Sequence, residues 1–448
     1  MSNVQALYQS KKKTVVEALK LIQSGDGIIA GLGSAAPMEI LKQIHTIGEN
    51  GVRDVMISDC LPMVPYDYVT KPFPGVITTG AFFYSPIQRA VVKGGNSGHL
   101  SHVPQRLHNA GLRRLFAYRE DKRRPVLLTS CGAMDEHGYL SLALSATFER
   151  VLLDEGALLI VEVNPQVPRT FGDTTIHISE IEALVEVDYP VPVFPQAPIS
   201  EDDAKIAGYV VERIEDGSTI QLGIGGIPNA VANWLKDKKH LGIHTEMIVD
   251  SMVDLVECGA VDNSMKTLYR HKTVGTFAMG SQRLYDFINN NPSVFLKNGT
   301  WVNDPAVIGL NYKMQSINTA LEVDLFGQCA SESIGPVQFS GSGGQADTAI
   351  GAQRTEGGHS YICLYSTATV TNKETGKKEV VSKIAPMLKA GSVVTLSRND
   401  VDYVVTEYGI ASLRGRSVKE RAERLIAIAH PDFRDELKFH VKNHPEIY

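Results

Sequence analysis

The chain reads GSTIQLGIGGIP at Gly217–Pro228, and this stretch repeats an earlier one. The earlier copy is GDGIIAGLGSAA at Gly25–Ala36. In both copies a short apolar run leads into a glycine-rich turn, which is typical of a buried strand followed by a loop and a helix. The similarity continues downstream, where MISD at Met56–Asp59 returns as MIVD at Met247–Asp250. We therefore expect a duplicated α/β scaffold.

The two copies differ at the residue that precedes this downstream motif. Val55 stands there in the first copy, and Glu246 stands there in the second. Glu246 lies between Ile243 and Met247–Val249, and this apolar pattern argues against a fully solvated side chain. The alternative is an ordinary surface carboxylate paired with His244 or a lysine. Because only one copy carries a carboxylate, Glu246 is the first candidate for chemistry.

Length and composition indicate a globular protein of two domains. The chain has 448 residues, which is more than one hydrophobic core usually serves. The longest apolar run, Ala157–Val161, is far too short to span a membrane, and no signal peptide is evident behind Lys11–Lys13. Five cysteines without a C-x-x-C pair suggest reduced thiols. We therefore expect a cytoplasmic protein with no membrane partner.

The charge distribution argues against a nucleic-acid partner, because the net charge is −6 and such partners require a basic surface. One segment is nevertheless basic, and its residues are Arg106, Arg113, Arg114, Arg119, Lys122, Arg123 and Arg124. It is either a solvated face beside Glu120 and Asp121 or a local phosphate site. No cluster of His, Cys and Asp has ligand spacing, so we expect no metal.

Short β-branched runs alternate with helical patterns in both halves, which predicts α/β domains with mostly parallel sheets. The clear strand candidates are 126–130, 157–163, 218–222, 243–249, 273–279 and 393–396. Four prolines between residues 190 and 198 precede an acidic helix start at Ser200–Asp203. We place the boundary there, which gives an N-terminal domain at 1–195 and a C-terminal domain at 196–448 that carries Glu246.

The second glycine loop has the features of an anion site. A buried strand through Ile220 and Leu222 would end at Gly223–Gly226, and Pro228 suits the first turn of the helix that follows. One face of that helix is formed by Ile227, Val231, Trp234 and Leu235. A glycine-rich turn at a helix N-terminus offers backbone N–H groups to a phosphate, a carboxylate or the oxyanion of an acyl transfer.

The glycine loops allow two interpretations. Gly31–Ala36 fits the dinucleotide fingerprint G-x-G-x-x-G/A, and Asp54 is placed to bind the ribose, so an NAD(P)-dependent dehydrogenase is the more distant alternative. In the second copy Pro228 stands where that fingerprint needs a small residue. The competing interpretation makes Glu246 a nucleophile that attacks an activated acyl group, with Gly223–Gly226 as its oxyanion hole.

Further motifs follow one another in order along the chain. They are EVNPQVP at Glu162–Pro168, LEVDLFGQ at Leu321–Gln328, SGSGGQAD at Ser340–Asp347, SRND at Ser397–Asp400, VTEYG at Val405–Gly409 and IAHPDF at Ile428–Phe433. Together with GIGGIP and GIHTEM around the second loop, they resemble the class I CoA-transferases. The similarity is to the acetyl-CoA hydrolase/transferase branch, especially its 4-hydroxybutyrate and butyrate:acetate CoA-transferases. One departure is Ser251, where relatives in this branch often have glycine, and it bears on acyl-chain preference.

The resemblance implies two similar open α/β domains in tandem, with the active site at the domain interface. It implies that Glu246 is the catalytic glutamate. The residues it assigns to the oxyanion or carboxylate are Gln221, Gly225, Gly226 and Gln328, and those it assigns to CoA are Gly343, Gly344 and Gln345. Tight backbone packing alone is the alternative for Gly343 and Gly344.

The implied reaction is a ping-pong transfer of CoA between short-chain carboxylic acids, through a glutamyl-CoA thioester on Glu246. Butyryl-CoA or 4-hydroxybutyryl-CoA would donate CoA to acetate. CoA is then a substrate that is held covalently in the intermediate, and no cofactor is bound permanently. Relatives suggest a homodimer or larger homo-oligomer, in fermentative acetate and butyrate metabolism. An acyl-CoA hydrolase is the nearer alternative.

Overall fold

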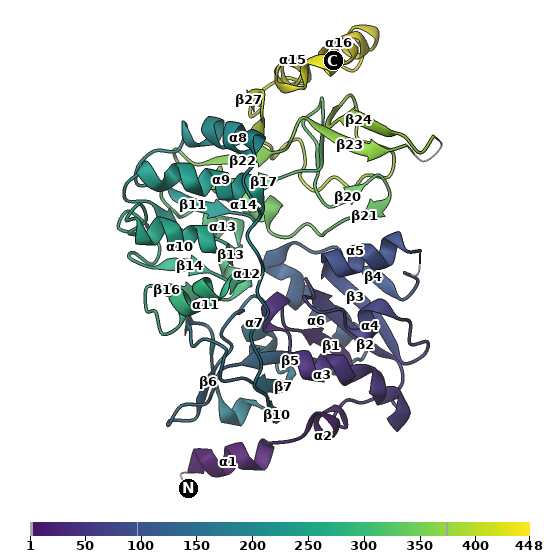
Figure 1. Ribbon diagram of the computed structural model, residues 1–448, viewed down its shortest axis with the longest axis vertical. Coiled ribbons are helices and arrows are strands. Elements are labelled where there is room, and N and C mark those ends of the chain that lie inside the picture. The colour runs from purple at the N-terminus through teal and green to yellow at the C-terminus, as the bar shows by residue number, and fades with distance from the viewer. Residues whose placement is uncertain (1–2, 96, 373–374) are drawn as a thin grey trace. The chain divides into compact units, whose positions relative to one another are not determined.

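The computed structural model describes residues 3–95, 97–372 and 375–448 (Figure 1). The chain forms two compact units. Unit 1 consists of Met1–Pro195, Glu246–Asp250 and Lys272–Asn303. Unit 2 consists of Gln196–Thr245, Ser251–His271 and Asp304–Tyr448. Each unit combines a large, mostly parallel sheet with helices.

This division differs from the two continuous domains predicted from the sequence. Pro195 does end the first long segment of unit 1, but Glu246 belongs to unit 1 and not to a domain that spans 196–448. The reason is strand pairing within unit 1. Strand β13 (Met247–Ile248) pairs with β15 (Phe277–Ala278), and β16 (Val294–Leu296) lies between β14 (Thr273–Gly275) and β8 (Phe171–Gly172).

The main sheet of unit 1 has seven parallel strands in the order β10-β7-β5-β1-β2-β3-β4. Their bounds are β1 Gly27–Ala30, β2 Val55–Cys60, β3 Ile77–Phe83, β4 Leu100–His102, β5 Pro125–Cys131, β7 Leu158–Val163 and β10 Ala183–Glu186. A separate antiparallel pair joins β6 (Tyr139–Ser141) to β9 (Thr175–His177). Apolar side chains of the central strands, such as Ile28 and Ile57, are fully buried in the core.

Short helices connect these strands. The α-helices of unit 1 are α1 Asn3–Lys11, α2 Val15–Leu19, α3 Met38–Gln43, α4 Asp67–Thr70, α5 Pro86–Lys93, α6 Ala110–Glu120, α7 Glu149–Asp154, α11 Gln282–Ile288 and α12 Gly299–Val302. Its 3-10 turns are η1 Gly33–Ala35, η2 Ile44–Asn50, η3 Leu107–Asn109 and η4 Ile178–Glu180. None of the helices in the described ranges is both long and apolar enough to cross a membrane.

The main sheet of unit 2 has six strands in the order β12-β11-β17-β22-β26-β27, and only the last pair is antiparallel. Their bounds are β11 Thr219–Leu222, β12 Gly242–Ile243, β17 Met314–Thr319, β22 His359–Cys363, β26 Tyr403–Thr406 and β27 Gly409–Ser412. Smaller sheets contain β18 Glu322–Asp324, β19 Cys329–Ala330, β20 Ser333–Ile334, β21 Val337–Gln338, β23 Thr367–Thr371, β24 Lys378–Ser382 and β25 Ile384–Ala385.

Helices α8 and α9 of unit 2 pack side by side against this sheet (Figure 1). The helices are α8 Glu201–Val211, α9 Gly226–Trp234, α10 Asp250–Glu257, α13 Pro305–Ile308, α14 Gln345–Ala352, α15 Val418–Ile428 and α16 Pro431–Asn443, with the 3-10 turn η5 at Leu235–Asp237. The predicted start of α8 is confirmed, because Ser200 caps the helix by accepting from the backbone N–H of Asp203. Of the four residues predicted to share one helix face, Ile227 and Val231 in α9 and Leu235 in η5 are buried, but Trp234 is 52% exposed.

The two sheets share one strand order, which confirms the prediction of two similar α/β scaffolds with mostly parallel sheets. The order β10-β7-β5-β1-β2 in unit 1 corresponds to β26-β22-β17-β11-β12 in unit 2. The strand register in the two sheets does not support the sequence match of Met56–Asp59 with Met247–Asp250, however. Gly27 pairs with Met56, and its counterpart Thr219 pairs with Gly242. In the sheet of unit 2, Gly242 rather than Met247 therefore takes the place of Met56.

Three of the six strand predictions are confirmed, namely 126–130, 157–163 and 218–222. The stretch 243–249 is wrong as one strand, because the chain leaves the six-stranded sheet after Ile243 and Glu246 lies at a bend before β13. The stretch 273–279 forms two short strands, β14 and β15. The stretch 393–396 is not a strand, and only Leu396 makes an isolated bridge, to Cys329.

Arginines of the basic segment bind groups within the protein. Arg119 pairs with Glu155 at 2.9 Å, and Arg123 pairs with Asp54 at 3.1 Å. Arg124 pairs with Asp26 at 2.7 Å. Much of the segment's charge is thus neutralised by carboxylates that are distant in the sequence.

A buried carboxyl group in β2 predicts a pH dependence of stability. Burial raises the pKa of Asp59 to about 7, although Gln88 and Tyr68 donate hydrogen bonds to its carboxylate. Because the folded-state pKa exceeds the unfolded value of about 3.9, the folded state binds more protons and loses stability as pH rises from about 4 to about 7. Asp59→Asn keeps a neutral amide there and removes this loss.

We expect urea unfolding to show the effect. From pH 5 to pH 8, the stability of Asp59→Asn should improve relative to the natural protein by roughly 2–3 kcal/mol. The matched control is Asp435→Asn, because the Asp435 side chain is 96% exposed. Parallel pH profiles for the natural protein and Asp59→Asn would contradict the assignment.

Candidate active site

The Glu246 carboxylate is half-buried and is held by groups of unit 1. Its backbone carbonyl accepts hydrogen bonds from Thr276 N at 2.9 Å and from Phe277 N at 3.0 Å. Asn303, which is 1% exposed and directly follows α12, donates from Nδ2 to Glu246 Oε2 at 3.2 Å. The structure therefore fixes both the backbone and the carboxylate of Glu246.

The sequence analysis missed Asn303 and the acidic surroundings of Glu246. Burial raises the pKa of the Cys60 thiol well above its usual value, and the negative charges of Asp59, Glu246 and Glu149 act in the same direction. Cys60 is thus a protonated thiol and a poor nucleophile. No local motif marks these residues, because Asn303 follows Glu246 by 57 positions and Cys60 belongs to another strand.

A glycine-rich loop follows β11 in unit 2. Gly225 has φ +120° and ψ −178°, a backbone conformation that favours glycine. Gly226 begins α9, and a Cβ atom there would lie 2.4 Å from Asp203 Oδ2. Asp203 is itself held by Ser200 and by the Tyr365 hydroxyl, which donates to Oδ1 at 2.7 Å. The first turn of α9 leaves N–H groups without partners inside the helix, so the loop can bind an anion.

Gln221, the third residue of β11, lies beside this loop and is fully buried. Its Oε1 accepts from Ser316 Oγ at 3.0 Å and from Asn318 Nδ2 at 3.3 Å. Its Nε2 has no hydrogen-bond partner in the part of the chain that is described. A buried amide donor without a hydrogen-bond partner lowers the stability of the fold. A hydrogen bond from this donor to an acceptor atom of a ligand would therefore be favourable.

The loop Gly343–Gly344 leads into α14 and adjoins the same polar network. Gly343 has φ +52°, and Gly344 is the N-cap residue of α14. Gln345 donates from Nε2 to Thr319 O at 2.9 Å, while its buried Oε1 has no partner among the described residues. Thr348, one turn further along α14, accepts from Ser316 Oγ at 2.9 Å. The structure thus connects Gln221 and α14 through Ser316.

Gln328 lies apart from this network, in a turn between β18 and β19. Its Nε2 donates to Asp324 Oδ2 at 2.7 Å, and its backbone N–H donates to Asp324 Oδ1 at 2.9 Å. Within the described ranges no hydrogen bond joins Gln328 to Gln221. The carbonyl-binding role of Gln328 stays a prediction.

A cavity of about 230 Å³ lies in unit 2 beside the glycine loop. It is lined by Ile224–Pro228, Thr319–Leu321, Cys363–Tyr365 and Lys383. The first three segments follow or end the neighbouring parallel strands β11, β17 and β22. Ligands of open α/β sheets bind at the carboxyl ends of such strands.

The comparisons with known proteins identify the family. Residues 1–195 match the acetyl-CoA hydrolase/transferase N-terminal domain, and residues 280–441 match the acetyl-CoA hydrolase/transferase C-terminal domain. The chain belongs to the acetyl-CoA hydrolase/transferase family. It is an enzyme and a CoA-transferase, the class to which its close relatives belong.

The chain is 42% identical to a succinyl-CoA:cyclohexane-1-carboxylate CoA transferase from Geobacter metallireducens, over 96% of this chain and 94% of that protein. It is 39% identical to a 4-hydroxybutyrate coenzyme A transferase from Clostridium kluyveri, over 96% and 97% of the two chains. The crystal structure of RipA from Yersinia pestis has a TM-score of 0.88 at 34% identity and covers 98% of this chain and 99% of that one.

This family assignment overturns the dehydrogenase alternative. The structure also gives the fingerprint another role, because Gly33–Ala35 forms a 3-10 turn and α3 begins only at Met38. Asp54, the proposed ribose ligand, pairs with Arg123. Among the residues described in this CoA-transferase, no group of three or more His, Cys, Asp or Glu side chains could hold a metal ion.

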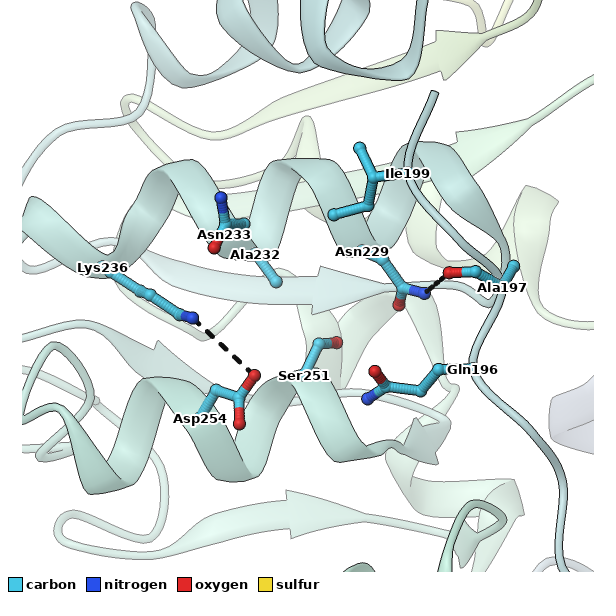
Figure 2. Close-up of a pocket in the computed structure, with 9 residues that line it drawn as sticks. All are labelled: Gln196, Ala197, Ile199, Asn229, Ala232, Asn233, Lys236, Ser251 and Asp254. Atoms are coloured by element: carbon cyan, nitrogen blue, oxygen red, sulfur yellow. Dashed lines mark hydrogen bonds and ion pairs between the residues drawn. The ribbon is translucent and has the colours of Figure 1, made fainter. Parts of the chain in front are cut away.

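Figure 2 shows a smaller cavity, of about 80 Å³, between α9, α10 and the segment 196–199. Asn229 Nδ2 donates to Ala197 O at 3.0 Å on one side, and Lys236 lies 3.8 Å from Asp254 on the other. Ser251 stands in the first turn of α10, and its buried hydroxyl has no partner in the described ranges. The residue that departs from the family glycine thus lines this cavity and not the one beside the glycine loop.

Proposed function

We propose that this enzyme transfers CoA between short-chain carboxylic acids, with acetate as one acid and butyryl-CoA or 4-hydroxybutyryl-CoA as the donor. The observation that supports this most directly is the restrained Glu246 carboxylate, hydrogen-bonded to Asn303 and half-buried. A carboxylate nucleophile needs this combination of fixed position and restricted water, because both favour attack on an acyl group over hydrolysis.

The proposed reaction proceeds through two covalent intermediates. A carboxylate oxygen of Glu246 attacks the thioester carbonyl, the C–S bond breaks, and a mixed anhydride and CoA thiolate form. The thiolate then attacks the glutamyl carbonyl, the anhydride C–O bond breaks, and the acyl acid leaves as a carboxylate. Glu246 now carries CoA as a thioester. Acetate reverses the two steps, which yields acetyl-CoA and the free glutamate.

Backbone and amide donors would stabilise the oxyanions of these steps. The N–H groups around Gly225 and Gly226 and the unpartnered Nε2 of Gln221 are suited to this role, and each such donor is worth about 3 kcal/mol in the transition state. We assign Gly343, Gly344 and Gln345 to CoA, and Gln328 to a second carbonyl. None of the proposed reaction steps is a redox step. CoA enters and leaves as a thioester in each cycle, so it serves as a substrate and not as a resident cofactor.

A mass-spectrometric experiment tests the covalent step. Incubation with butyryl-CoA alone should give a protein adduct heavier by the mass of CoA minus water, because Glu246 retains CoA after the butyrate leaves. Acetate should then discharge the adduct and release one equivalent of acetyl-CoA. Steady loss of butyryl-CoA without acetate and without an adduct would instead identify an acyl-CoA hydrolase.

We propose further that the enzyme acts in the cytoplasm as a homodimer or larger homo-oligomer, in fermentative acetate and butyrate metabolism. The cysteines support a reducing compartment, because all five are free and only Cys258 is exposed. The proposal of an oligomer rests on the family resemblance alone, and sedimentation analysis would test it.

A further inference from the structure

A buried loop of unit 1 contacts both of the segments that hold Glu246. This supporting loop comprises residues 144–148, which lie between β6 and α7, and it ends at Glu149, the first residue of α7. All residues from 144 to 149 are buried. The function of the supporting loop must therefore be sought in its contacts inside unit 1.

The first set of contacts leads to the backbone of Glu246. Ser145 forms an antiparallel bridge with Phe277. Next to it, Ala146 N donates to Thr276 O at 2.9 Å. The N–H groups of Thr276 and Phe277 are the two donors that bind the carbonyl of Glu246. A shift of the supporting loop would therefore shift the segment that fixes the Glu246 backbone.

The second set of contacts leads to the carboxylate of Glu246. Gly299 N, at the start of α12, donates to Thr147 O at 3.0 Å, and a Cβ atom at Gly299 would lie 2.6 Å from the same oxygen. Helix α12 thus packs directly on the supporting loop. Asn303 N donates to Gly299 O at 3.0 Å, and Asn303 Nδ2 donates to Glu246 Oε2. The position of the Asn303 amide therefore depends on the supporting loop as well.

The Glu149 carboxyl group holds the supporting loop in its conformation. Its Oε2 accepts from Ser145 Oγ at 2.9 Å and from Phe148 N at 3.1 Å. Ser145 Oγ also accepts from Thr147 N at 3.2 Å. Burial raises the pKa of Glu149, while the hydrogen bonds from Ser145 and Phe148 act in the opposite direction. A neutral amide at this position is therefore a close substitute for the carboxyl group.

We infer that Glu149 is a positioning residue, which fixes the backbone and the carboxylate of Glu246 through the supporting loop for attack on the thioester. This inference rests on the proposed transfer reaction and adds a residue to it. Glu149 and Glu246 lie in one neighbourhood, because both act electrostatically on the Cys60 thiol. Since a misplacement of about 1 Å can cost about 10²-fold in rate, loss of Glu149 should lower turnover rather than the binding of CoA esters.

The experiment measures kcat and KM for butyryl-CoA, with acetate as acceptor, in Glu149→Ala, Glu149→Gln, Ser145→Ala and the natural enzyme. We expect Glu149→Ala to lower kcat about tenfold with KM unchanged, and to slow formation of the CoA adduct by the same factor. Glu149→Gln should retain most of kcat, because its amide oxygen can accept from Ser145 and Phe148 as the carboxylate does. Ser145→Ala should lower kcat by a smaller factor, and it decides the question if Glu149→Ala does not fold.

Asp26→Ala is the matched control, because Asp26 is also a buried carboxylate of unit 1 and pairs with Arg124. Asp26 directly precedes β1, whereas Cys60 is the last residue of the parallel strand β2. Asp26 therefore lies at the opposite end of the main sheet from Cys60. Its loss should lower the melting temperature and leave kcat unchanged.

Three results would overturn the inference. One is a lower melting temperature with normal kcat in Glu149→Ala, and another is a rise in KM alone. The third is an equal loss of kcat in Glu149→Gln and Glu149→Ala, because the ionisable carboxyl itself would then be required. Absence of both transfer and adduct in the natural enzyme would refute the proposed function itself, which is a different result.

Discussion

Glu246→Gln is expected to lower the rate of CoA transfer by about 10⁴-fold or more, the scale of loss seen when a nucleophile is removed. The substitution replaces the attacking oxygen by an amide of nearly the same shape. Its remaining carbonyl oxygen can still accept from Asn303, so the fold should be retained. The rate of acetyl-CoA formation from butyryl-CoA and acetate measures the effect.

Two further observations make this prediction specific to covalent catalysis. The CoA adduct should be absent in Glu246→Gln, while CoA itself should still bind in calorimetry. Glu49→Gln serves as the control, because Glu49 is an exposed carboxylate of unit 1 and its loss should not alter turnover. Near-normal transfer by Glu246→Gln would exclude Glu246 as the carrier of CoA.

Gly225→Ala is expected to cause the next largest loss, of about 10²-fold in kcat. The backbone at this position has φ +120°, which an alanine adopts only with strain of about 1–3 kcal/mol. Space is not the obstacle, because the nearest atom to an added Cβ is Pro228 Cδ at 4.0 Å. The loop would relax toward another conformation, and its N–H groups would no longer suit the oxyanion-binding role proposed for them.

Gly208→Ala is the matched control for this substitution. Gly208 lies within α8, and an added Cβ would have no atom within 4 Å. Because alanine favours helices over glycine, stability should rise by up to about 1 kcal/mol with turnover unchanged. If Gly225→Ala lowered the melting temperature but left kcat intact, the loop would have a structural role alone.

Much of the fold could be predicted from local sequence patterns. The strand, glycine turn and helix at Gly217–Pro228 are where the pattern places them, and Ser200 starts α8 as predicted. These elements depend on the periodic spacing of apolar residues and on helix-capping residues that lie within a few positions of the helix end. Both patterns can be read directly from the sequence. The sequence match at Met247–Asp250 failed, because only β-sheet register shows that Gly242 corresponds to Met56.

The candidate site could be predicted only in part. Gln221, Gly225, Gly226 and Gln345 lie near one another because neighbouring parallel strands of unit 2 end at one edge of the sheet. Asn303 belongs to no motif, and its place in the site depends on a contact with Glu246, which is distant along the chain.

The sequence by itself determined the family, the repeated α/β scaffold and the identity of the candidate nucleophile, because these follow from local periodicity and from motifs in a fixed order. The tertiary structure alone decided that the segment beginning at Glu246 packs into unit 1, that Asp203 closes against Gly226, and that Lys383 lines the cavity beside the glycine loop. The physical reason is that packing, hydrogen bonding and desolvation depend on distance in space. Residues that pack against or hydrogen-bond to one another across long sequence separations form no recognisable local pattern in the sequence.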